Sequence, residues 1–313
     1  MENTTAQFFE ELDKLYAAGK MEDVEQFLLA SGRRYAPCCG GFNPTYLAVL
    51  SELGGFYRGT SRYRASLNSF EAAQDVIGRF LGTDTVEYAT NLNNMAGTCR
   101  LMGEYEKSLG LFQKALDIYE STVSAESYLY ASALNNMALL YQSMEDYKEA
   151  AACLEKALGI IKTLPDCEEE AATSYTNLAA LYQKMGQKAK AAENLEMALS
   201  IFKGNDASPH YAAALNIRAG LQFNAGEYSA AADTYLETLA QTNRFFGHNI
   251  EYGIACENLA HTYEKSGQLD LAAEYMVKAK DIFEAVRGKD HPSSQKAIDA
   301  LREMEERRNT CSL

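Results

Sequence analysis

The chain has 313 residues, of which 47% are hydrophobic, and a formal net charge of −14. This acidic balance argues against a protein that binds the phosphate backbone of nucleic acids, because such proteins gather lysine and arginine to displace counterions. It also disfavours docking on anionic membranes, and no apolar run is long enough to span a bilayer.

The N-terminal segment is acidic and lacks the basic and apolar regions of a signal peptide. The 7 cysteines form no CxxC pair and match no zinc-ligand spacing, so we expect free thiols, no metal and no cofactor. We place Cys99, Cys153 and Cys256 inside helix packing and the adjacent Cys38 and Cys39 in a loop. Free thiols are typical of a reducing compartment, and we expect a cytoplasmic protein.

We expect helices throughout, because the chain has only 5 prolines and no segment with the alternating pattern of a strand. A degenerate first pair at 5–35 contains a break at Gly19-Lys20 and a second helix near 22–29. An irregular link at 31–44, with two prolines and three glycines, precedes the next pair. The further pairs are expected at 45–79, 87–121, 128–163, 169–204, 209–244 and 250–286, and an amphipathic helix at 292–308 caps the last apolar surface.

One motif recurs along these pairs at a fixed period. Leu134-Asn135-Asn136-Met137-Ala138 is its fullest form. The positions equivalent to Asn136 are spaced 40 to 42 residues apart, and they hold Asn94, Asn177, Ile217 and Asn258. A period in this range is typical of a solenoid. We therefore predict a single all-α solenoid domain over 1–313, with about seven antiparallel helix pairs and a capping helix.

Small residues recur two places after the asparagine, and again in the second helices. Small side chains let two helices approach closely while larger ones fill the flanking space. In the first helices they are Ala96, Ala138, Ala179, Ala219 and Ala260, and in the second helices Ala73, Ala115, Ala157, Ala198 and Ala279. The glycines between paired helices, Gly103, Gly186, Gly226 and Gly267, fit a C′ position that needs a positive φ.

The set Ala138, Tyr141, Ala150 and Ala157 resembles the tetratricopeptide repeat, which has small residues at positions 8, 20 and 27 and an aromatic or apolar residue at 11. The longer period, the Leu-Asn-Asn-Met-Ala core and the Gly-Lys-Asp-His-Pro lead-in at 288–292 resemble the kinesin-light-chain subgroup. No heptad coiled coil like that of kinesin light chains occurs. The resemblance implies a right-handed superhelix whose first helices line a concave, peptide-binding groove.

Positions 5 and 6 of the first helices form a stripe of amides on this predicted groove. Carboxamides carry both donors and acceptors, which match the backbone of an extended peptide. The predicted peptide-binding amides are Asn93, Asn94, Asn135, Asn136, Asn177, Asn216 and Asn258. An open alternative is that these amides bond only within the repeat array.

Cations follow the amides at positions 12 and 13. Arg100, Lys184 and Lys265 would add positive charge at the groove edge and favour an acidic peptide. The alternative is an ordinary solvated helix end near the C-terminal dipole. Position 2 holds Thr90, Ser132, Thr173, Ala213 and Ile254 instead of the lysine of a carboxylate clamp, so we do not expect binding of chaperone C-termini.

These features predict a non-enzymatic scaffold or adaptor that binds a protein or peptide segment, with no nucleic acid and no membrane partner. The 4 histidines lie in separate repeats or loops, and no HExxH, glycine-rich phosphate loop or GxSxG motif occurs. The alternative is a peptide-sensing regulator resembling the bacterial quorum-sensing tetratricopeptide receptors, whose grooves also use asparagine ladders.

Overall fold

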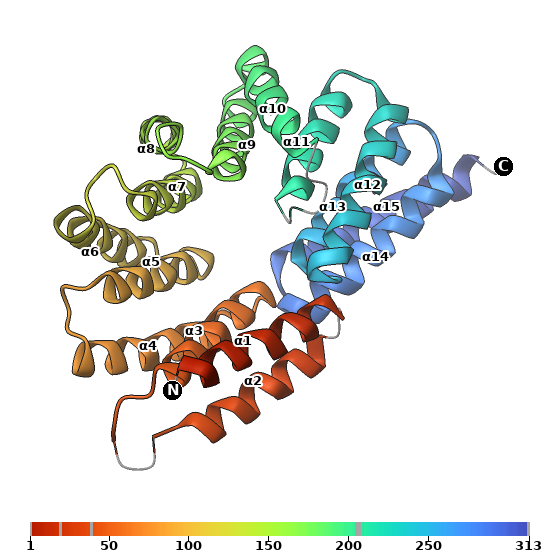
Figure 1. The fold of residues 1–313 in the computed structure, drawn as a ribbon. Helices are drawn as coiled ribbons and strands as arrows, with labels where there is room; N and C mark the ends of the chain where they lie inside the picture. Colours follow the sequence, from red (N-terminus) through yellow and green to blue (C-terminus); the bar gives the residue numbers. More distant parts are fainter. Residues whose placement is uncertain (1, 19–20, 38–39, 204–207, 209, 312–313) are drawn as a thin grey trace. The chain divides into compact units, whose positions relative to one another are not determined.

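The computed structural model describes residues 2–18, 21–37, 40–203, 208 and 210–311. Cys38, Cys39, the break at Gly19-Lys20 and most of the 204–209 link lie outside the described residues. The described part contains fifteen α-helices and no strand, which confirms the predicted all-α class of seven pairs and a final helix (Figure 1). The helices are α1 (Glu2–Ala17), α2 (Met21–Tyr35), α3 (Pro44–Gly59), α4 (Tyr63–Phe80), α5 (Val86–Leu101), α6 (Tyr105–Thr122), α7 (Tyr128–Ser143), α8 (Tyr147–Ile161), α9 (Glu168–Lys184), α10 (Lys188–Phe202), α11 (Tyr211–Asn224), α12 (Tyr228–Phe246), α13 (Ile250–Lys265), α14 (Leu269–Arg287) and α15 (Pro292–Cys311).

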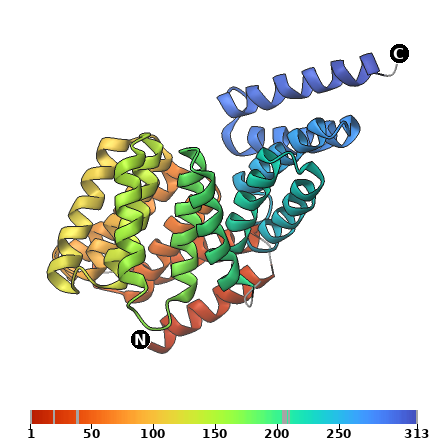
Figure 2. The same ribbon diagram turned by 90° about the horizontal axis from the view of Figure 1, so that it is seen from above.

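The chain divides into two compact units, unit 1 (Met1–Leu181) and unit 2 (Tyr182–Leu313), with the boundary inside α9. Within unit 1, α3 pairs with α4, α5 with α6 and α7 with α8, and the first helices α3, α5 and α7 contact one another in sequence. Figure 1 shows these first helices as one layer and their second helices as another. Within unit 2, α11 pairs with α12 and α13 with α14, and α15 lies along α14 (Figure 2).

Local capping sets the ends of the first helices. The side-chain oxygens of Thr85, Ser127 and Asn249 each accept a hydrogen bond from a backbone N–H of the first turn. The predicted positive φ between paired helices is confirmed at Gly103, Gly186, Gly226 and Gly267, where φ is 78, 71, 82 and 79°. Ser61 and Glu145 occupy the same turn in two other repeats with φ of 61 and 62°.

The small residues lie where each helix pair crosses. All ten predicted alanines of the first and second helices are fully buried. Gly54 takes this place in α3, and its carbonyl accepts a hydrogen bond from Ser66 Oγ at 2.8 Å. Ser108 Oγ donates in the same way to the carbonyl of Ala96 at 2.8 Å. A small residue and a serine hydroxyl therefore fix how these two pairs meet.

The expectation for α2 was wrong at its C-terminal end. The helix continues through Gly32 to Tyr35, so the first residues of the predicted irregular link at 31–44 are helical. Leu28 and Ser31 are buried on this helix, and a Cβ added to Gly32 would lie 3.8 Å from Val49 of α3. Packing against α3 therefore outweighs the weak helical preference of glycine.

Free cysteines occupy the packing between helices, as predicted. Cys99, Cys153 and Cys256 are buried and unpaired. Burial raises the pKa of the Cys153 thiol to about 11 and that of Cys256 to about 12, so both thiols stay protonated at neutral pH.

We expect Glu52→Gln to raise the melting temperature at pH 7.5 and to leave it unchanged near pH 4. Glu52 of α3 stands where other repeats have asparagine, and burial, followed by the nearby Asp13 carboxylate, raises its pKa. A carboxyl with a raised folded pKa costs no stability below its unfolded pKa, and the cost grows from there until pH has risen through the folded pKa. Thermal melts of both proteins across this range test the sign. An equal difference at both pH values would contradict it.

Candidate functional site

The predicted amides lie on what we call the first-helix face, which in each unit is the surface formed by positions 2, 5, 6, 9 and 13 of its first helices. All seven asparagines are half-buried, neither enclosed in the core nor fully exposed. Unit 1 holds five of them, and unit 2 holds Asn216 and Asn258. A buried alanine follows each amide two or three residues later, which puts the amide at the edge of the packing layer.

Neighbouring first helices of unit 1 are joined through these amides. Asn136 Nδ2 donates to Asn93 Oδ1 at 3.3 Å, across one repeat. Asn135 Nδ2 donates to Ser174 Oγ at 2.9 Å, across the next. The alternative interpretation, bonding within the array, therefore accounts for part of the stripe. A carboxamide that makes one such bond still has further donors and acceptors.

Several amides of the stripe have polar atoms without a partner in the described part of the chain. The Oδ1 atoms of Asn135 and Asn216 are buried and accept no hydrogen bond there. The side chains of Asn177 and Asn258 make no hydrogen bond to any described residue. Burying an unpaired amide oxygen costs free energy. The Oδ1 atoms of Asn135 and Asn216 are closed to solvent and to a ligand, whereas the half-buried side chains of Asn177 and Asn258 remain accessible to one.

The predicted cations differ in their surroundings. Arg100 is half-buried in unit 1, and its Nη1 donates to Ser143 Oγ of α7 at 3.5 Å. Lys184 and Lys265 are exposed in the last turns of α9 and α13. Only Arg100 lies among the predicted amides of unit 1, since Lys184 and Lys265 belong to unit 2.

The sequence reasoning missed Arg58, which lies one 42-residue period before Arg100. Arg58 Nη1 donates to the backbone oxygen of Asn94 at 3.4 Å and to its Oδ1 at 3.3 Å. The guanidinium also lies 5.8 Å from the centroid of the Phe70 ring. The available signal was the register, because residues 58 and 100 share one position of the repeat.

Arg58 and Arg100 line one cavity of about 340 Å³ on the first-helix face of unit 1. Its walls come from α3, α5 and α7 and include Gly55, Gly59, Gly97 and Asn136, with Leu101 and Leu139 as apolar parts. We call this cavity the arginine pocket. Asn136 belongs both to the pocket and to the amide stripe, so the two features are continuous.

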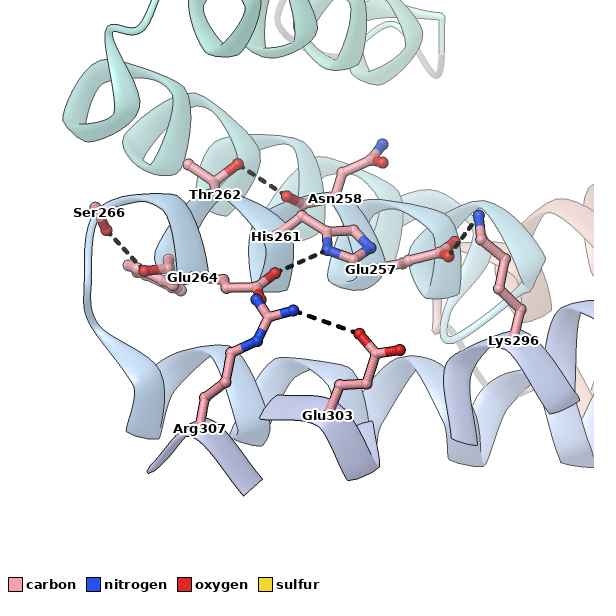
Figure 3. A network of polar contacts seen from close by, with 10 residues as sticks. Glu257, Asn258, His261, Thr262, Glu264, Ser266, Lys296, Glu303 and Arg307 are labelled. Atoms are coloured by element: carbon pink, nitrogen blue, oxygen red, sulfur yellow. Dashed lines mark hydrogen bonds and ion pairs between the residues drawn. The ribbon is translucent and has the colours of Figure 1, made fainter. Parts of the chain in front are cut away.

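In unit 2, long side chains link α13 to the C-terminal helix α15 (Figure 3). Lys296 Nζ of α15 lies 3.4 Å from Glu257 Oε1, and Arg307 contacts Glu264. His261 Nδ1 lies 3.4 Å from Glu264 Oε2. These contacts explain why position 5 is glutamate in this repeat, while the Asn258 amide points away from α15 in Figure 3.

Antiparallel helix pairs that meet at small residues and recur every 40 to 42 residues define a helical-repeat protein with an amide-lined face. Family models of the tetratricopeptide repeat match residues 45–121 and 129–204 in one case and 254–293 in another. The chain belongs to the tetratricopeptide repeat family.

Several solved structures have a similar fold. The Rap conjugation gene regulator of the plasmid pLS20, solved in complex with the Phr* peptide, has a TM-score of 0.68 at 14% identity, over 90% of this chain and 73% of that one. Aspartyl phosphate phosphatase F from Bacillus subtilis gives 0.66 at 13% identity, over 90% and 70%. BtubC (BKLC) from P. vanneervenii gives 0.51 at 20% identity, over 66% and 91%. Identities this low establish the fold alone.

No curated protein sequence matches the chain. None of the helices in the described ranges combines the length and the apolar character that crossing a membrane requires.

Proposed function

We propose that this chain is a non-enzymatic scaffold or adaptor that binds an extended peptide or protein segment along the first-helix face of a unit. The observation that carries the proposal is that the half-buried amides of Asn177 and Asn258 make no side-chain hydrogen bond to a described residue and remain accessible to a ligand. An extended peptide offers backbone N–H and C=O groups at regular intervals, which suit such amides. Binding would depend weakly on side-chain sequence at these positions.

A peptide-sensing regulator is the second candidate. What favours it is the fold similarity to the Rap conjugation gene regulator, which was solved with a peptide bound. A regulator differs from a passive adaptor because its ligand must bind one conformation better than another. Small-angle scattering with and without a bound peptide separates the two, since only the regulator requires the profile to change.

The residues of the first-helix face favour a non-enzymatic role. Amides and arginines donate hydrogen bonds but supply no paired nucleophile and base. Because one structure of similar fold is named an aspartyl phosphate phosphatase, hydrolysis of a phosphoaspartyl substrate is the assay that would contradict a non-enzymatic role.

We place the protein in the cytoplasm, because its buried thiols Cys99, Cys153 and Cys256 suit a reducing compartment.

We expect the double variant Asn136→Ala/Asn177→Ala to weaken binding of selected peptides about tenfold, the loss of one or two hydrogen bonds. The probe is a library of random decapeptides selected on the wild-type protein. The melting temperature should fall by no more than ~4 °C, because only the Asn136–Asn93 bond is removed from the fold.

Asn68→Ala is the matched control, since Asn68 is exposed on α4 of the same unit. It should leave both binding and melting temperature unchanged. Binding that survives the double variant, or that is lost equally in the control, would count against the proposed site.

A further inference from the structure

We propose that the arginine pocket binds a carboxylate of the peptide ligand, either an acidic side chain or the C-terminal carboxylate. Arg58 and Arg100 supply the charge, and Asn136 joins the pocket to the amides that hold the peptide backbone. This inference rests on the proposed function and names the class of peptide that the same face selects.

The arginine pocket holds two positive charges, and Arg58 has no carboxylate partner among the described residues. Among the residues that the structure describes, no carboxylate forms an ion pair with Arg58, whose hydrogen bonds go to the neutral oxygens of Asn94. Burial, and then the nearby charge of Arg100, lower the pKa of Arg58. A partly desolvated guanidinium beside a second one is stabilised by an anion placed between them. This local charge is opposite in sign to the chain's net charge of −14.

Three glycines line the arginine pocket and keep it open. A Cβ added to Gly55 or Gly59 of α3 would meet no atom within 4 Å, so no packing requires glycine at either place. At Gly97 of α5 an added Cβ would lie 3.4 Å from Arg58 Nη1, close to the guanidinium itself. Glycine inside a helix costs stability relative to alanine. Three glycines around one cavity therefore preserve space beside the two arginines.

The chemistry of the pocket favours a carboxylate on a peptide. A guanidinium presents paired N–H donors that match the two oxygens of a carboxylate, and such charge-assisted bonds are stronger than those to neutral groups. A cavity of about 340 Å³ has room for an acidic side chain with its stem. Nucleic acid is disfavoured as the source of the anion, because the formal net charge of −14 repels a polyanion.

The test begins with the strongest decapeptide selected from a random library on the wild-type protein. Each of its aspartates and glutamates is replaced by the matching amide, and its C-terminus is amidated in a separate peptide. We expect one of these neutralisations to weaken binding to the wild type ten- to a hundredfold, the range of a charge-assisted contact. The same change should alter binding less than twofold in Arg58→Gln/Arg100→Gln.

Two further variants separate the pocket from general effects. Gly55→Leu fills the pocket without removing a charge and meets no atom close to its Cβ, so it should abolish the preference for the acidic peptide while the fold melts normally. Arg79→Gln removes one charge from an exposed position of α4 and should leave the preference intact.

Each other outcome overturns the inference in a recognisable way. Peptides that bind with no acid-to-amide preference overturn this inference and leave the proposed function standing. Failure to select any peptide overturns the proposed function together with it. Arginine-dependent binding of inorganic phosphate without the peptide preference assigns the pocket to a free anion instead. A tenfold preference for phosphoserine over glutamate in the same peptide assigns it to a phosphate.

Discussion

Gly54→Ala is expected to lower the melting temperature of unit 1 by about 4–10 °C, whereas the same change at the adjacent Gly55 should raise it by one or two degrees. A Cβ built on Gly54 would lie 2.5 Å from Phe70 Cε1 and 2.6 Å from Cδ1 and Cζ. Phe70 is fully buried, so its ring cannot move aside without opening a cavity. Overpacking of this kind costs about 1–3 kcal/mol.

Gly55 faces the arginine pocket, where an added methyl meets nothing within 4 Å. There the substitution contributes only its better helix propensity, about 0.5–1 kcal/mol. Two neighbouring glycines of one helix therefore respond with opposite signs to an identical change. This difference separates packing at the helix crossing from helix propensity.

Differential scanning calorimetry of the two single variants measures the effect. Phe70→Leu, combined with Gly54→Ala, supplies the rescue, because the smaller side chain gives space to the added methyl. The double variant should be more stable than the sum of the two single losses predicts. Equal melting temperatures for Gly54→Ala and Gly55→Ala would contradict the close approach of Gly54 to the ring.

The fold could be predicted because its determinants are local and repeated. The helix pairs expected at 128–163 and 250–286 start where α7 and α13 start, and side-chain caps mark both starts. The end of α2 could not be placed, because Gly32 reads as a break while packing against Val49 keeps it helical. Local signals thus fail where contact with another helix decides the conformation.

The candidate site could be predicted only in part. The repeat register places the amides at equivalent positions of successive first helices, but the equivalent Asn136 and Asn177 differ in their partners. That difference depends on which residue the next helix presents at hydrogen-bonding distance. The arginine pocket was missed because three glycines leave the space that forms it. The sequence analysis looked for recurring side chains, and glycine has none.

Met304→Asp is expected to undock α15 and destabilise unit 2 by about 3 kcal/mol or more, while unit 1 keeps its stability. Met304 is 1% exposed and belongs to a buried cluster with Met276, Phe283 and Ala297. The change removes the apolar contact and buries a carboxylate without a partner. Hydrogen exchange should rise in peptides from α13 and α14 and stay unchanged in α5 and α6.

The adjacent Glu305→Asp places the same new side chain at an exposed position of α15 and should have little effect. Met304→Leu keeps the apolar contact and should cost less than about 1.5 kcal/mol. The introduced carboxylate adds a dependence on pH, because its cost grows as pH rises from its unfolded pKa to its raised folded pKa and falls away on acidification. Stability of Met304→Asp relative to wild type should therefore improve as pH falls toward 4. A stability deficit that stays constant with pH would show that the loss of packing, and not the buried charge, accounts for the destabilisation. Hydrogen exchange that rises equally in α5 and α6 would show that the two units unfold together.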